Sequence, residues 1–172
     1  MTMKKTVLFV LSGLMLSAPV VFADKSEKDK EEAQQIAKVA QAIDNKTFVI
    51  WVTTIVPQSA PSIQSGREYC IRVKDGVANG RLPFFGRSFT AVLGSDDSSI
   101  EIKDVPVTIS RKTKGRKKQT VYTIEFKTEG TTKWECTATV WDNGNADIYC
   151  NSPSKTPMTS YGELDLEDPE QE

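Results

Sequence analysis

Few residues of this chain could do chemistry. There is no histidine among its 172 residues, so the Ser-His and Cys-His pairs that activate nucleophiles are absent. A general base near neutral pH would have to be a shifted carboxylate or lysine, and no spacing marks such a group. The segment 142–145 (DNGN) has a calcium-like composition but lacks the spacing and the closing glutamate of a calcium loop. We predict that the protein is not an enzyme and has no catalytic residues, metal site or cofactor.

The three cysteines allow three different single disulfides, each of which leaves one thiol over. Apolar and polar residues alternate on both arms of a hairpin predicted over residues 133–151, so facing residues must share a face. A three-residue loop, 142–144, places Gly144 in the left-handed position and Cys136 opposite Cys150. We therefore predict a Cys136–Cys150 disulfide and a free Cys70; the alternative is three unpaired thiols.

A ligand could be bound by the heptapeptide 81–87 (RLPFFGR). In this interpretation Phe84, Phe85 and Tyr161 line the mouth of a cavity, and Arg81 or Arg87 meets an anionic headgroup. The alternative is that the two phenylalanines fill the core.

A second candidate site is basic. Six of the eight residues from 111 to 118 are Lys or Arg, and Arg116, Lys117 and Lys118 could contact a polyanion such as lipopolysaccharide phosphates. The alternative is a solvated hairpin loop whose charges keep a sheet edge from pairing. No aromatic residues are interleaved with these charges, so nucleic acid is not expected as a partner.

The N-terminus has the three parts of a secretory signal peptide: Lys4 and Lys5, an apolar run over 7–16, and the ending Val21-Phe22-Ala23 with a small residue at the cleavage site. We predict cleavage after Ala23 and export to the periplasm or the medium. A transmembrane anchor is the competing interpretation, but the run is short for a bilayer span. The net charge is −1, and six acids lie in the last ten residues, so we expect a disordered acidic tail over 165–172.

Between these ends, periodicity predicts one helix and many strands. Ala33, Ile36, Ala37, Ala40 and Ile43 recur at helical spacing, so residues 24–45 should form an amphipathic helix that lies against the sheet. A partner-binding helix is the alternative.

Residues 46–164 contain short alternating segments separated by turn signals. We predict one antiparallel β-domain, a barrel or closed sandwich of about eight to ten strands and of lipocalin-like size. Strands are expected over 47–56, 68–74, 88–93, 121–127 and 158–164, with a hairpin turn at 75–76. Two short strands are expected next, one through Ile100 and Ile102 and one through Val105, Val107 and Ile109, and Pro106 indicates an edge or a bulge between them. Gly86 can take a positive φ, and we expect it to let the chain start again after Pro83.

Two segments carry a resemblance to a known family. The stretch 82–89 (LPFFGRSF) and the closing stretch 158–164 (MTSYGEL) resemble the two signature segments of exported bacterial proteins known as domain of unknown function 4251. The likeness spans about 46–164. Family members often have tyrosine where this chain has Phe84. The resemblance implies a cell-envelope protein and supplies no catalytic residues.

We therefore predict an exported cell-envelope protein that binds a small apolar or amphipathic ligand without catalysis. The alternative is a structural or protein-interaction module of the periplasm that uses the sheet edge or the helix. An enzyme is the third hypothesis.

Overall fold

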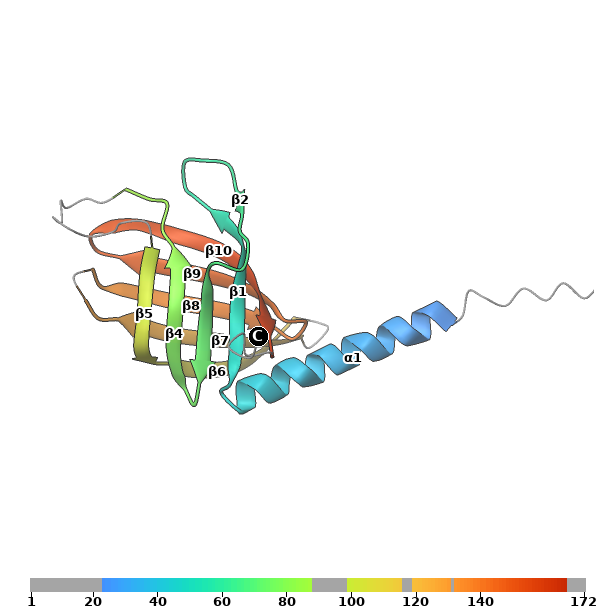
Figure 1. Ribbon diagram of the computed structural model, residues 1–172. Helices are drawn as coiled ribbons and strands as arrows, with labels where there is room; N and C mark the ends of the chain where they lie inside the picture. The colour runs from blue at the N-terminus through green and yellow to red at the C-terminus, as the bar shows by residue number, and fades with distance from the viewer. Residues whose placement is uncertain (1–22, 88–98, 116–118, 131, 167–172) are drawn as a thin grey trace, which may run out of the picture.

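The computed structural model describes residues 23–87, 99–115, 119–130 and 132–166. One helix precedes a strongly curled antiparallel sheet (Figure 1). The elements are α1 (Ala23–Asp44), β1 (Phe48–Val56), β2 (Ile63–Gln64), β3 (Cys70–Lys74), β4 (Val77–Pro83), β5 (Ser99–Pro106), β6 (Thr108–Lys114), β7 (Gln119–Thr128), β8 (Trp134–Trp141), β9 (Asn145–Ser152) and β10 (Lys155–Asp165). The predicted signal peptide, the predicted strand 88–93, the basic residues Arg116, Lys117 and Lys118, and the end of the acidic tail lie outside the described residues.

Nine strands follow one another in the order β5-β4-β3-β1-β10-β9-β8-β7-β6, and β2 pairs with β1 at the side. The predicted antiparallel β-architecture with a single N-terminal helix is confirmed. The sheet curls into a half-barrel rather than closing, because β5 and β6, its two end strands, do not form a ladder with each other.

The core lies inside the curl and is built from the alternating positions that the sequence indicates. Ile50 on β1, Ile71 on β3 and Ile148 on β9 are at most 1% exposed. Apolar side chains with almost no accessible surface contribute most of the stability of such a domain. The interior is therefore packed with side chains and is not an empty lumen.

The two predicted hairpins have the expected registers. Val73 faces Ala78 and Ile71 faces Gly80 across the 75–76 turn. On the longer hairpin Cys136 faces Cys150, and these residues form the predicted disulfide while Cys70 stays free. Gly144 has a φ of 92°, as a three-residue hairpin loop requires.

The region around Pro106 differs from the prediction. Ile102 and Val105 belong to one strand, β5, and the break falls at Val107, where the chain bends and continues as β6. The amide of Val107 donates a hydrogen bond to the carbonyl of Gly76 (3.0 Å) and so is satisfied outside the ladders. The bulge is real but lies earlier, opposite Asn79, whose side chain bonds Asp104. β6 extends to Lys114, so within the described part of the predicted loop, 111–115, residues 111–114 are strand and Gly115 lies in a turn.

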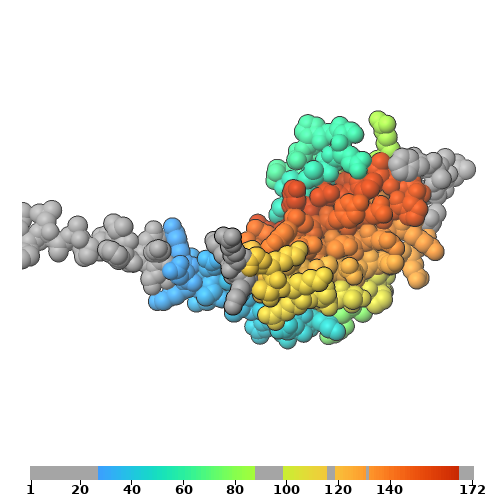
Figure 2. Space-filling model, turned by 180° about the vertical axis from the view of Figure 1, so that it is seen from behind, coloured from blue at the N-terminus to red at the C-terminus, as the bar shows by residue number. Residues whose placement is uncertain are grey.

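The helix is confirmed, but its expected packing is wrong. Among residues 27–44, the part of α1 whose side chains the structure describes, only Val39, Ala42 and Ile43 are buried, whereas Ala33 and Ile36 of the predicted stripe are exposed. The first turns of α1 project away from the sheet (Figures 1 and 2). Ala33, Ile36 and Ala37, which lie before the last two turns of α1, therefore do not pack against the sheet. Within the described ranges, no helix combines the length and hydrophobicity that a membrane crossing requires.

Candidate functional site

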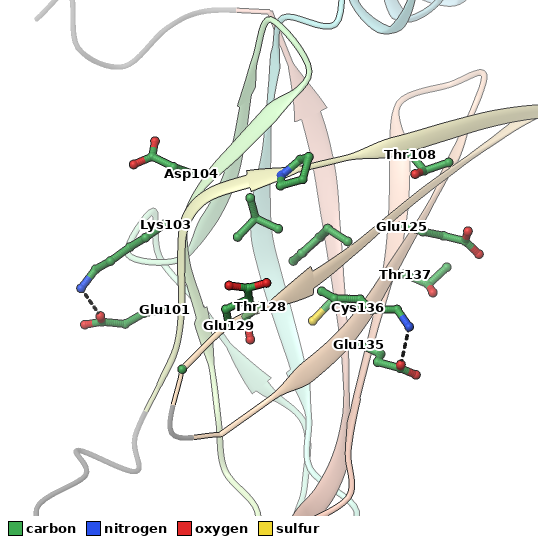
Figure 3. A pocket seen from close by; sticks show the side chains of 15 residues that line it. Glu101, Lys103, Asp104, Thr108, Glu125, Thr128, Glu129, Glu135, Cys136 and Thr137 are labelled. Carbon is green, nitrogen blue, oxygen red and sulfur yellow. Dashed lines mark hydrogen bonds and ion pairs between the residues drawn. The ribbon is translucent and has the colours of Figure 1, made fainter.

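A cleft of about 1030 Å³ opens where the half-barrel fails to close (Figure 3). Its walls come from β5 and from the ends of β7 and β8, and its roof is the bend at Pro106. Val105, Phe126 and Cys136, all buried core residues, reach its floor. A concave site with an apolar floor and a few polar groups is the usual form of a ligand-binding pocket.

The rim of the cleft is acidic. Five carboxylates and two ammonium groups line it. Lys103 pairs with Glu101 (2.5 Å) and Lys127 with Glu135 (2.6 Å). The hydrogen bond that Lys127 donates to Glu135 raises the pKa of Lys127. The other three carboxylates are those of Asp104, Glu125 and Glu129, so the rim carries a negative excess.

Both walls of the cleft end in unpaired strand edges. β5 pairs with β4 on one side, and no described strand pairs with its other side. β7 pairs with β6 only as far as Glu125, so Phe126, Lys127 and Thr128 bond β8 alone. Unpaired strand edges present backbone donors and acceptors to anything that enters between them.

The predicted ligand-binding residues do not line this cleft, and they do not line the two smaller pockets at Trp51–Arg67 and at Gln35–Leu166. Phe84 is buried and meets Trp134 edge to face, with ring centroids 5.3 Å apart at 62°. The ammonium of Lys155, itself only 5% exposed, lies 4.9 Å from the Phe84 centroid. Phe84 therefore anchors one end of the barrel, as the core-filling alternative requires.

The remaining four residues point elsewhere. Phe85, which lies past the end of β4, is 48% exposed, and Tyr161, on β10, is 45% exposed. The guanidinium of Arg81 lies 5.5 Å above the Tyr69 ring, a cation–π contact. Arg87 is exposed, and its backbone bonds Thr156.

Gly86 serves close packing and not a positive φ, contrary to the expectation from sequence. The backbone of Gly86 does not have a positive φ. A Cβ there would overlap Thr156 Oγ1 and lie 2.7 Å from the Phe84 ring. In the first signature segment, Gly86 therefore allows the Phe84 ring and Thr156, at the start of β10, to pack closely.

Cys70 is half-buried on β3. Burial raises the pKa of its thiol, and the nearby Arg72 opposes this only in part. A thiol with a raised pKa is a poor nucleophile, which gives no support for a reactive role. No group of His, Cys, Asp and Glu able to hold a metal occurs in the described part of the chain.

Sequence reasoning missed the cleft because its residues come from two separate segments, 101–108 and 125–137. The available signals were Pro106, which predicted an edge, and the alternation of acids with apolar residues in 99–105 and 124–129. Neither signal says that the two segments face each other across a gap.

The fold and the cleft define a class: a curled half-barrel with an N-terminal helix and an acidic opening in its wall. The family model described as domain of unknown function (DUF4251) matches residues 30–164, and the chain belongs to this family. The fold is similar to that in the crystal structure of a DUF4251 family protein from Bacteroides eggerthii DSM 20697. The TM-score is 0.53 at 17% identity, over 78% of this chain and 89% of that one. A search of curated proteins found no match.

Proposed function

We propose that the protein is an exported, non-catalytic binding protein and that its ligand occupies the cleft between β5 and β7. The observation that carries this proposal is the cleft itself, about 1030 Å³ in volume, which joins an apolar floor to an acidic rim. A volume of this order accommodates a small amphipathic ligand. The ligand chemistry that fits is an apolar body with a cationic group.

Two further features support the proposal. The Cys136–Cys150 disulfide suits an oxidising compartment outside the cytosol, in keeping with the signal-like N-terminus. The chain has no histidine, the side chain that most often acts as a general acid or base. Export is tested by determining the N-terminus of the protein purified from its host, where Asp24 should come first.

Ligand binding is tested by calorimetric titration with dodecylammonium below its micellar concentration, with dodecyl sulfate as the charge control. Thr137 lines the cleft, whereas Thr139, two residues further along the same face of β8, does not. Thr137→Trp should fill the cleft and weaken dodecylammonium binding by about tenfold or more, and Thr139→Trp should change it by less than about twofold. Equal binding of both amphiphiles, or equal effects of both substitutions, would place the ligand elsewhere.

The alternative role, a protein-interaction module, is favoured by one observation, the unpaired strand edges that flank the same cleft. These unpaired edges also indicate which class of ligand the cleft could bind.

A further inference from the structure

The free edge of β5 is the feature from which the ligand class follows. Residues Ser99 to Ile102 are extended and, among the described strands, pair only with β4. Lys103 and Asp104, which has a φ of 50°, form the bulge that ends this regular stretch. About four residues of ladder therefore have an edge open to an added strand, and Glu101 and Lys103 of this segment line the cleft.

A strand that paired with β5 would have a fixed alternation of side chains. On β5, Ile100 and Ile102 point into the core, and Glu101 and Lys103 point outward. Directly opposite residues of neighbouring strands share a face, so alternate side chains of the added strand would reach the floor at Val105 and Phe126. The others would reach the rim.

The charges on the rim of the cleft determine which side chains an added strand should carry. The lysines of the cleft are already paired with Glu101 and Glu135, whereas Glu125 and Glu129 form no ion pair with any described residue. Both lie on or just after β7, across the cleft from β5 (Figure 3). Basic side chains on the outward face of an added strand would meet these carboxylates.

We propose that the cleft binds an extended peptide segment of another protein, in which basic and apolar residues alternate, by adding it as a strand to the free edge of β5. The inference rests on the proposed binding function and names the ligand class. The acidic tail of this chain, with six acids and no base in its last ten residues, has the wrong charge for the same place.

The test uses the full mature chain and a capped, fluorescently labelled hexapeptide that alternates lysine and valine. Fluorescence anisotropy measures the affinity, and hydrogen exchange locates the site. We expect binding, with slower exchange of amides in residues 99–103. A peptide that alternates glutamate and valine should not bind, and N-methylation of the lysine–valine peptide on alternate residues should abolish binding, because strand addition needs main-chain hydrogen bonds.

The protein-side variant is Glu125→Gln with Glu129→Gln, and the matched control is Glu68→Gln with Glu163→Gln, two exposed acids outside the cleft. Each exposed ion pair contributes little, so the first pair should weaken binding by about 3- to 10-fold and the control pair by less than about twofold. The difference should shrink at high salt.

The outcomes separate the two proposals. If N-methylated and unmodified peptides bind equally, strand addition is wrong while cleft binding stands. If no peptide binds but dodecylammonium does, the peptide inference is overturned and the proposed function survives; if neither binds, both fail. If sedimentation shows a dimer of the chain and the peptide dissociates it, the cleft is occupied by a second copy, and the choice of another protein as occupant is wrong.

Discussion

Arg87 and Thr156 form two hydrogen bonds with each other across the end of the half-barrel. The Arg87 amide donates to Thr156 Oγ1 (2.9 Å), and the Thr156 amide donates to the Arg87 carbonyl (3.1 Å). Sixty-nine residues separate the two along the chain. This pair joins the segment after β4 to the start of β10, and Gly86 leaves the room for it.

Gly86→Ala should therefore destabilise the protein. The added methyl group must displace Thr156 or the Phe84 ring, and overpacking of this kind costs about 1–3 kcal/mol. Gly66→Ala is the matched control, because a Cβ at Gly66 has no neighbour within 4 Å. Urea denaturation measures both, and equal stabilities of the two variants would contradict the close-packing role of Gly86.

The two adjacent phenylalanines should differ in their contributions. Phe84 is 4% exposed and Phe85 is 48% exposed. Phe84→Ala should lower the free energy of unfolding by about 3–5 kcal/mol, whereas Phe85→Ala should change it by less than about 1 kcal/mol. A large loss in Phe85→Ala would show that its ring is packed.

The helix offers a second matched pair. Ile43, in its last turn, is 4% exposed, and Ile36, two turns earlier, is 37% exposed. Ile43→Ala should cost about 2–5 kcal/mol, and Ile36→Ala less than about 1 kcal/mol. Thermal melts followed by circular dichroism distinguish them. Similar losses would mean that the projecting part of α1 is buried in solution.

The thiol content should follow the disulfide assignment. The unfolded, unreduced protein should show one free thiol, that of Cys70, and the reduced protein three. The Cys136–Cys150 bridge closes a loop with a sequence separation of 14, so the reduced protein should be less stable by up to about 3 kcal/mol. A peptide map that links Cys70 would refute the assignment.

Asp147 should make the stability of the protein depend on pH. Desolvation raises the pKa of its carboxyl above the ordinary value of 3.8, so the folded state holds this proton more tightly than the unfolded state. At low pH, where Asp147 is protonated in both states, its ionisation costs no stability. As the pH rises above the pKa of the unfolded state, ionisation of Asp147 lowers the free energy of unfolding. Asp147→Asn should raise Tm at pH 7 relative to the parent protein and leave it nearly unchanged at pH 3. An equal gain at both values would mean that ionisation is not the cause.

Local features of the fold could be predicted from the sequence where a short-range pattern decides them. The alternation around 134–140 and 146–150 fixed the register that brings Cys136 to Cys150, because a slip by one residue would expose the apolar set. The turn at 75–76 was equally local. The packing of α1 could not be predicted, since periodicity shows that a helix has an apolar stripe and not how much of it meets a surface.

The cleft could not be predicted for a related reason. Its walls, β5 and β7, are separated in the chain by β6 alone, but in the sheet they lie near opposite ends of the strand order. Whether a sheet closes depends on the summed curl of all its strands. The candidate residues were chosen from their types, and aromatic residues such as Phe84 serve packing as readily as binding.

The bend at Val107 also ties the cleft to the helix. The Val107 amide bonds the Gly76 carbonyl, and the Gly76 amide bonds the Lys46 carbonyl (3.5 Å), two residues past the end of α1. Two backbone hydrogen bonds thus connect the base of the projecting helix to the corner from which one cleft wall descends. The segment that leaves α1 and the corner above the cleft therefore form one hydrogen-bonded junction.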